Sequence, residues 1–369
     1  MRLEELDFYI PPGLIAQQPV EPRDSCRLLV MTGSGARVHT DFDDLPRYLR
    51  PGDLLVVNDS RVLPARVYAR KNTGGTVELL FLRPAASYQE DVWEALARPS
   101  RRLRAGMLLT VGNRQVELHR LLEEGRWLVS VTGRGGVIPF LERCGELPLP
   151  PYIHRQPVDP EDYQTVYAAA LGSAAAPTAG LHFTQQLLAE ICAMGCEITA
   201  VTLHVGLDTF RPISEPVVED HTIHREFYTV SPESLKAINR AKRERRRLIA
   251  VGTTSVRVLE TLYGGNSRVS LRIAGASAPA SLGGGVGGST GLYITPGYEF
   301  AAVDVLITNF HLPRTSLLAL VMAFGGVGAV RDAYREAVAR QYRFFSFGDA
   351  MLIERPSVFA GVDPVGSGS

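Results

Sequence analysis

The chain has 369 residues, of which 45% are apolar and 21% charged, and its 39 basic side chains equal its 39 acidic ones. This composition excludes a disordered or fibrous protein, and zero net charge excludes a global basic field for nucleic acid. Its four cysteines are too few for a disulfide framework, and its longest apolar run, residues 317–324, is too short to span a bilayer. We therefore expect a cytoplasmic protein without a membrane partner.

The first part of the chain predicts a buried strand and then a small β-barrel. The strand is the apolar run at residues 54–57, which lies between Gly52 and a polar turn. Six short strand-like segments follow between residues 66 and 131, separated by glycine and asparagine turn signals. The proline-rich segment "ELPLPPYIH" (146–154) then indicates a domain boundary.

Beyond residue 159 the pattern becomes α/β. Amphipathic helices are expected at 184–195, 231–247, 253–262, 315–324 and 329–343, and strands at 196–203, 248–251, 303–307 and 350–353. This alternation predicts a mostly parallel sheet. The predicted fold is a discontinuous α/β domain (1–62 and 152–355) with an inserted all-β barrel (63–151) and a disordered tail (356–369). The glycine-rich stretch 264–291 is expected to be a flexible loop.

Polar side chains follow three of the predicted strands at the point where each strand ends. In open α/β sheets this edge is where ligands bind. The residues are His204 and Gly206; Thr253, Thr254 and Arg257; and Thr308, Asn309 and His311. Each cluster alone is ordinary loop chemistry, but the coincidence of three favours a site.

The segment "APTAGLHFT" (176–184) supports the same interpretation. It places Thr178, Gly180 and His182 at a loop-to-helix entry, where backbone N–H groups and small side chains can bind a polar ligand. A metal site at His221, His224 and Glu226 is the alternative. The surroundings predict no long helix and no cysteine joins these residues, so we expect no metal.

Two basic runs and one aromatic cluster leave alternatives open. The runs, 98–104 and 240–247, are either solvated surfaces or contacts for a polyanion. The aromatic cluster "YRFFSFGD" (342–349), which contains Arg343, is either core or a platform for an unpaired base.

Taken together, these motifs resemble one family, the S-adenosylmethionine:tRNA ribosyltransferase-isomerases of the queuosine pathway. The resemblance runs in order through "LRPGDLLVVNDSRVLPAR", "APTAGLHFT", "HVGLDTFRPI", "VGTTSVRVLE", "ITNFHLPRTSLLALVMAFGG" and "YRFFSFGDAML". It covers most of residues 8–352. This sequence departs from the family pattern at "HTIHRE", through Thr222, Ile223 and Arg225, and at Asp208, where the family usually has glycine.

The resemblance implies a tRNA-modifying enzyme. Such an enzyme moves the ribosyl part of S-adenosylmethionine onto 7-aminomethyl-7-deazaguanine at the tRNA wobble position and isomerises it. The products are epoxyqueuosine, adenine and methionine. The resemblance also implies that no metal or nicotinamide cofactor is needed, and that the fold is an α/β domain with an inserted β-barrel.

The reaction then suggests roles for residue types. A base must remove a proton next to the sulfonium, and the candidates are His182, His204, His224, Glu226 and His311. Asn309 and Asp349 are candidates to assist the departure of adenine, and Arg257 to bind the methionine carboxylate. The full set expected to bind substrate is Thr178, Gly180, Gly206, Thr253, Thr254, Arg257, Thr308, Asn309, Arg343 and Asp349.

Two rival hypotheses remain at this stage. One is an RNA-binding module without catalysis, whose barrel binds the RNA. The other is a histidine-rich metallohydrolase. A monomer is the expected state, and the sequence does not decide which domain binds the anticodon stem-loop.

Overall fold

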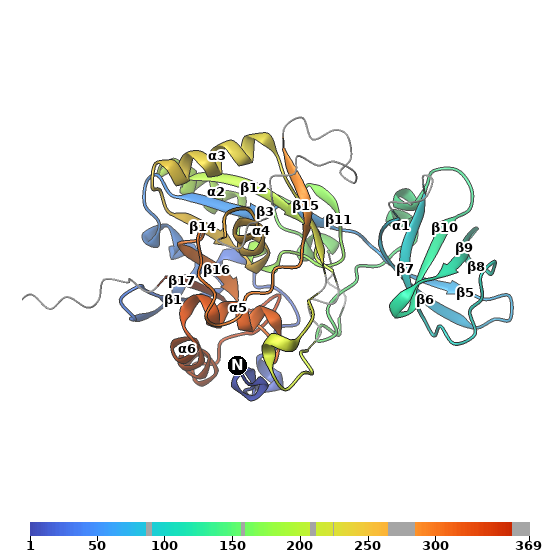
Figure 1. Ribbon diagram of the computed structural model, residues 1–369, viewed down its shortest axis with the longest axis horizontal. Helices are drawn as coiled ribbons and strands as arrows, with labels where there is room; N and C mark the ends of the chain where they lie inside the picture. Colours follow the sequence, from blue (N-terminus) through green and yellow to red (C-terminus); the bar gives the residue numbers. More distant parts are fainter. Residues whose placement is uncertain (86–90, 156–158, 207–211, 224, 265–284, 356–369) are drawn as a thin grey trace, which may run out of the picture.

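The computed structural model describes residues 1–85, 91–155, 159–206, 212–223, 225–264 and 285–355. Figure 1 shows a large part built on one sheet and a small barrel that stands apart from it. The predicted tail (356–369) and most of the predicted glycine-rich loop lie outside the described residues.

The large part is built on a sheet with nine strands in its described residues, in the order β15-β13-β12-β3-β14-β16-β17-β1-β2. The strands are β1 (Arg27–Met31), β2 (Arg37–Asp41), β3 (Leu54–Asn58), β12 (Glu197–Leu203), β13 (Glu226–Val230), β14 (Leu248–Val251), β15 (Val286–Thr290), β16 (Val305–Asn309) and β17 (Ala350–Glu354). The central strands β12, β3, β14 and β16 are parallel, as predicted. Among the flanking pairs, β1–β17 is parallel, whereas β13–β15, β12–β13, β16–β17 and β1–β2 are antiparallel, so the sheet is mixed rather than mostly parallel.

Helices cover both faces of this sheet. They are α2 (Gln185–Ala193), α3 (Pro232–Arg243), α4 (Thr253–Tyr263), α5 (Ser316–Gly325) and α6 (Val327–Ala339). Alternate residues of β3 belong to different cores: Leu54 and Val56 pack with α3–α6, whereas Leu55 and Val57 pack with α2. A strand buried on both faces reads as a continuous apolar run, which explains why β3 was predictable.

The barrel is closed and all antiparallel, in the order β10-β7-β6-β5-β8-β9. Its strands are β5 (Arg66–Arg70), β6 (Thr76–Pro84), β7 (Val92–Arg98), β8 (Leu108–Val111), β9 (Arg114–Leu121) and β10 (Arg126–Val131). These correspond to the six predicted segments. A helix that the sequence analysis did not predict, α1 (Val137–Cys144), packs Phe140 and Leu141 into the barrel core.

A short parallel pair, β4 (Ser60–Val62) with β11 (Ala170–Ser173), lies where the chain leaves the sheet and returns to it. The fold class, an α/β domain with an inserted β-barrel, is therefore confirmed. The domain boundaries at 62/63 and 151/152 stay a prediction.

One expectation for the glycine-rich stretch was wrong: residues 286–290 form strand β15, which pairs with β13. Among the described residues, no single helix could cross a membrane. Only α5 and α6 together, which meet at a bend of 112°, have the length and composition for a span.

Candidate active site

The carboxyl ends of the parallel strands meet at one edge of the sheet, which we call the catalytic edge. Val201 of β12 lies opposite Asn58 of β3, and Val251 of β14 lies opposite Ile307 of β16. The residues that follow these strands are His204, Asp59, Gly252 and His311. The structure thus brings together the three polar clusters that the sequence predicted, and adds a fourth after β3.

His204 follows β12 and is half-buried at this edge. Its backbone N–H donates to the Phe227 carbonyl, and its ring stands against Gly172, where an added Cβ would lie 3.0 Å from the ring carbon Cε1. Its Nδ1 has no hydrogen-bond partner among the described residues. Burial lowers the pKa of His204, while the negative charge of Asp59 raises it. This ring is therefore largely neutral at pH 7 and has a nitrogen free to accept a proton.

His182 is buried between Cys26 and Asn309. The Asn309 side-chain amide donates to the Phe345 carbonyl at 3.1 Å and to Nε2 of His182 at 3.0 Å. Since Nε2 accepts, the proton of the neutral ring lies on Nδ1, which is 3.2 Å from the Cys26 sulfur. Burial, with the charges of Arg343 and Arg23, lowers the pKa of His182 to about 3. His182 is thus a neutral hydrogen-bonding group at physiological pH and a weak base.

His311 is held in a similar way. Its Nε2 lies 2.8 Å from the Thr308 hydroxyl, and its backbone N–H donates to the Tyr334 hydroxyl at 2.9 Å. Burial lowers the pKa of His311 to about 3. Thr308, expected to bind substrate, contacts the His311 ring through its hydroxyl, and its role in substrate binding stays a prediction.

Glu226 and Arg257, which the sequence analysis gave separate roles, form a buried ion pair with each other. Glu226 on β13 is 7% exposed and Arg257 on α4 is 4% exposed. The Gly206 N–H donates to the Glu226 carboxylate at 2.9 Å, and Arg257 also donates to the Leu292 carbonyl at 3.2 Å. The guanidinium expected to bind a substrate carboxylate therefore already has a protein carboxylate.

The first turn of α4 is also buried, but no side chain caps its N–H groups. Its N-cap residue, Gly252, has a φ of 89° and provides no side-chain cap. The N–H groups at such a helix start can bind an anion. Thr253 and Thr254 begin this turn, and the buried Thr254 hydroxyl has no hydrogen-bond partner among the described residues.

The segment around Gly180 closes one side of this turn. Gly252 faces Ala179, and a Cβ added at Gly180 would lie 2.0 Å from the Tyr167 hydroxyl. The buried hydroxyls of Tyr167 and Thr165 have no partner within the described part of the chain. Burial and the charge of Asp59 raise the pKa of Tyr167, so its hydroxyl stays protonated and can donate. Thr178 starts the short 3-10 helix η7 (Thr178–Gly180) that carries this segment.

Asp349 and Arg343 contact the segment on either side of Cys26, from Gln18 to Arg27. The buried Asp349 carboxylate accepts from the backbone N–H groups of Arg27 and Arg343, at 3.0 and 2.7 Å, and from the Arg27 guanidinium. Arg343 donates to the Gln18 carbonyl. Tyr342, Phe344, Phe345 and Phe347 are at most 4% exposed, so the aromatic cluster is core and not a platform for a base.

The remaining histidine positions do not form a metal centre in the described chain. His221 bonds Glu215 at 2.9 Å, whereas His224 and Asp208 lie outside the described residues. No three His, Cys, Asp or Glu side chains converge in the part of the chain that the structure describes.

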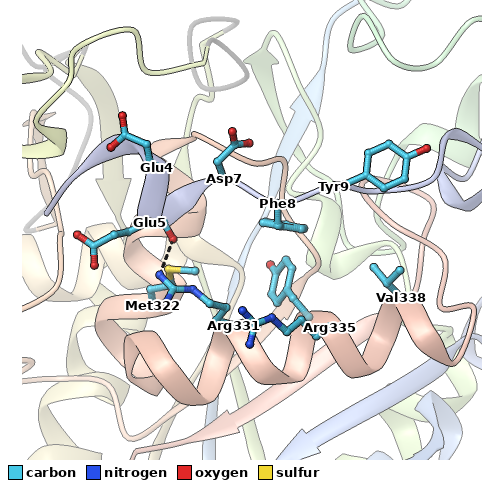
Figure 2. Close-up of a pocket in the computed structure, with 10 residues that line it drawn as sticks. Glu4, Glu5, Asp7, Phe8, Tyr9, Met322, Arg331, Arg335 and Val338 are labelled. Atoms are coloured by element: carbon cyan, nitrogen blue, oxygen red, sulfur yellow. Dashed lines mark hydrogen bonds between the residues drawn. The ribbon is translucent and has the colours of Figure 1, made fainter.

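A cavity of about 570 Å³ lies elsewhere, between the N-terminal segment and α6. Figure 2 shows Glu4, Glu5 and Asp7 on one side of it and Arg331 and Arg335 on the other. None of the predicted site residues lines this cavity. Among the residues that line it, Tyr334 contacts the catalytic edge, because its hydroxyl accepts from the His311 N–H.

Comparisons with known proteins agree over nearly the whole chain. Residues 3–353 match the model of a family described as queuosine biosynthesis protein. A S-adenosylmethionine:tRNA ribosyltransferase-isomerase of Moorella thermoacetica is 48% identical, with 96% of this chain and 100% of the relative covered. One of Rubrobacter xylanophilus is 50% identical, with 96% and 98% covered. The crystal structure of an S-adenosylmethionine tRNA ribosyltransferase from Thermotoga maritima matches with a TM-score of 0.52 and 36% identity, over 95% of this chain and 99% of that one.

The buried ion pair leads to a stability prediction. Glu226→Ala leaves the Arg257 guanidinium buried without its carboxylate, which should lower the free energy of unfolding by about 3–5 kcal/mol. Asp332→Ala, which breaks the exposed Asp332–Arg335 pair, should cost at most about 1 kcal/mol. Denaturant unfolding of both variants measures this. Equal losses would show that the buried pair is not a structural cross-link.

Proposed function

The chain belongs to the queuosine biosynthesis family, and on that premise we propose that it transfers and isomerises the ribosyl part of S-adenosylmethionine onto tRNA. The acceptor in this proposal is 7-aminomethyl-7-deazaguanine at the wobble position, and the products are epoxyqueuosine, adenine and methionine. The proposal includes no metal or nicotinamide cofactor. A monomer in the cytoplasm is its working form.

The observation that carries the proposal is the set of unpartnered polar atoms at the catalytic edge. They are Ser60 Oγ, Thr165 Oγ1, Tyr167 OH, Thr254 Oγ1, Asn309 Oδ1 and His204 Nδ1, each buried and without a partner among the described residues. A buried polar group left unpaired costs about 1–3 kcal/mol, so a cluster of them is explained best by a polar ligand. The ribose hydroxyls and amino-acid end of S-adenosylmethionine offer matching donors and acceptors.

We assign the carboxylate of the methionine part to the first turn of α4 rather than to Arg257. The uncapped N–H groups of that turn favour an anion, and the Thr254 hydroxyl stands beside them. Arg257 is engaged by Glu226, so a carboxylate would have to displace a buried ion pair to reach it.

We assign the general base to His204. The hydrogens next to a sulfonium are weakly acidic, so the base must combine proximity with a pKa near the working pH. The pKa values of His182 and His311, at about 3, make them poor proton acceptors. His204 has a less buried ring, a free nitrogen and the carboxylate of Asp59 to stabilise its protonated form.

The reaction predicts defined products. Incubation with S-adenosylmethionine and tRNA that carries 7-aminomethyl-7-deazaguanine should release adenine and methionine in equal amounts. The nucleoside should gain a ribosyl-derived mass, measured by mass spectrometry. A methyl-sized gain together with S-adenosylhomocysteine would contradict ribosyl transfer. Folded protein that binds tRNA but releases nothing would favour the RNA-binding module, and loss of activity on chelation would favour a metalloenzyme.

The assignment of the base to His204 predicts a large loss of the rate of adenine release in a His204 variant, and a shifted pH profile in an Asp59 variant. His204→Asn should slow adenine release by about 10²–10⁴-fold, whereas His119→Asn in the barrel should not. The active form of His204 is the neutral ring, and burial lowers its pKa from 6.5, so the acidic limb of kcat/KM should lie below pH 6.5.

Asp59→Asn removes the charge that raises this pKa, so the limb should move to still lower pH. A limb that stays in place in Asp59→Asn, or normal turnover in His204→Asn, would assign the base to another group.

A further inference from the structure

The two basic runs of the sequence differ in how many of their side chains form ion pairs within the structure. In the run 240–247, Arg240 and Arg246 both pair with Glu197, and Arg247 pairs with Asp53 and Glu354. Lys242 donates to the Ala301 carbonyl at 3.0 Å. Only Arg243 and Arg245 are exposed without an ion pair or hydrogen bond of the side chain to the described residues. This run is mainly a structural network that ties α3 to the sheet.

The run 98–104 is unpaired. Arg98, Arg101, Arg102 and Arg104 lie on the connection from β7 to β8 and are all exposed. None of their guanidinium groups forms an ion pair or hydrogen bond with the described residues. Four cations held without carboxylates on a closed barrel are available to an external anion.

The register of β5, β6 and β7 places further exposed side chains near these arginines. β7 ends at Arg98, which lies opposite Glu78 of β6, and Glu78 lies opposite Tyr68 of β5. Two strand spacings therefore separate Tyr68 from Arg98, about 10 Å. Tyr68 is 48% exposed. Arg70 and Lys71 follow at the end of β5, at the same end of the barrel. We call this group the basic end: Tyr68, Arg70, Lys71, Arg98, Arg101, Arg102 and Arg104.

Acids at this end are fewer. They are Glu78, whose Oε1 lies 3.8 Å from Arg66 Nε, and Glu117, which is in register with Leu108 at the start of β8. Glu123 and Glu124 belong to the turn η5 (Glu123–Gly125) between β9 and β10. The charge of the whole barrel agrees: residues 63–151 hold 13 Lys and Arg against nine Asp and Glu, while the rest of the chain holds 26 against 30. The neutral chain thus consists of a positive barrel and a negative body.

The basic end is also remote from the catalytic edge. β5 starts at Arg66, whose backbone pairs with Glu146 at the start of the proline-rich segment 146–154. From there β5 runs outward to Arg70, about 13 Å farther along an extended strand. The barrel itself stands apart from the sheet (Figure 1). A ligand that contacts both places must be extended and must carry regularly spaced negative charge along its length, as an RNA stem does.

We propose that the basic end binds backbone phosphates of the tRNA while the wobble nucleotide lies at the catalytic edge. This inference rests on the proposed function and adds the surface that holds the substrate. Arg101 and Arg102 contact phosphates, and Tyr68 provides an exposed ring beside them. Phosphate contacts carry no sequence information, so the surface positions the tRNA and leaves recognition to the wobble base.

The test compares two charge-matched variants of the full chain, Arg101→Gln/Arg102→Gln on the barrel and Arg243→Gln/Arg245→Gln at the C-terminal end of α3 (called the α3 variant). The probe is unmodified tRNA without S-adenosylmethionine, and the measurement is the dissociation constant as a function of salt. The barrel variant should bind roughly 10- to 30-fold more weakly at about 0.15 M salt, and the slope of log K against log salt should fall by about 1–2. The α3 variant should match the wild type.

A kinetic readout separates this surface from the chemistry. The barrel variant should raise KM for the substrate tRNA and leave kcat at saturating tRNA unchanged. An unchanged salt slope in the barrel variant, or an equal loss in the α3 variant, would overturn the inference. If tRNA binding changes as predicted but the wild type releases no adenine, the basic end binds tRNA and the proposed reaction is rejected. If adenine release is normal but the barrel variant binds tRNA like the wild type, the reaction stands and the inference about the basic end is rejected.

Discussion

The parallel pairing of β3 with β12 on one side and β14 on the other is the constraint on which the site depends. Leu55 of β3 is in register with Ile198 and with Ile249, so three strands that are far apart in the sequence end at one edge. Every residue of β3 is buried, and a slip of one residue would exchange its two faces. The register that satisfies both cores is therefore also the register that places Asp59, His204 and Thr253 together.

The Glu226–Arg257 pair shows why residue type alone assigns roles poorly. A buried charge needs compensation from within the protein, and two such charges from different elements compensate each other. Because both groups are then committed to the fold, the binding that we propose relies on weaker groups: N–H groups of a helix start, hydroxyls and one imidazole. A site of this kind positions its substrate through many short contacts rather than through one charge.

Local pattern predicted the elements well and their long-range partners less well. The barrel strands, β3, β14 and α2–α6 follow from apolar periodicity, caps and turn residues within each segment. Strand β15 could not be predicted from "VGGST", because glycines favour a loop and its strand conformation comes from pairing with β13. The antiparallel flanks depend likewise on pairing between distant segments. Among site residues, the clusters after the strands were predictable, whereas the Cys26–His182–Asn309 contacts required the folded arrangement.

Zero net charge is a misleading summary of this chain, because the barrel and the body carry opposite excesses. Attraction of RNA phosphates to the barrel is accompanied by repulsion from the body, and both effects act over about 8 Å at physiological salt. The phosphate backbone is therefore drawn away from the sheet and toward the barrel. The aminomethyl group of the proposed acceptor base is a primary amine that is cationic at neutral pH, so this base, unlike a phosphate, meets no such repulsion when it enters the catalytic edge. Charge separation between two domains can thus select which part of one substrate reaches the reacting groups, without a residue that recognises that part by charge.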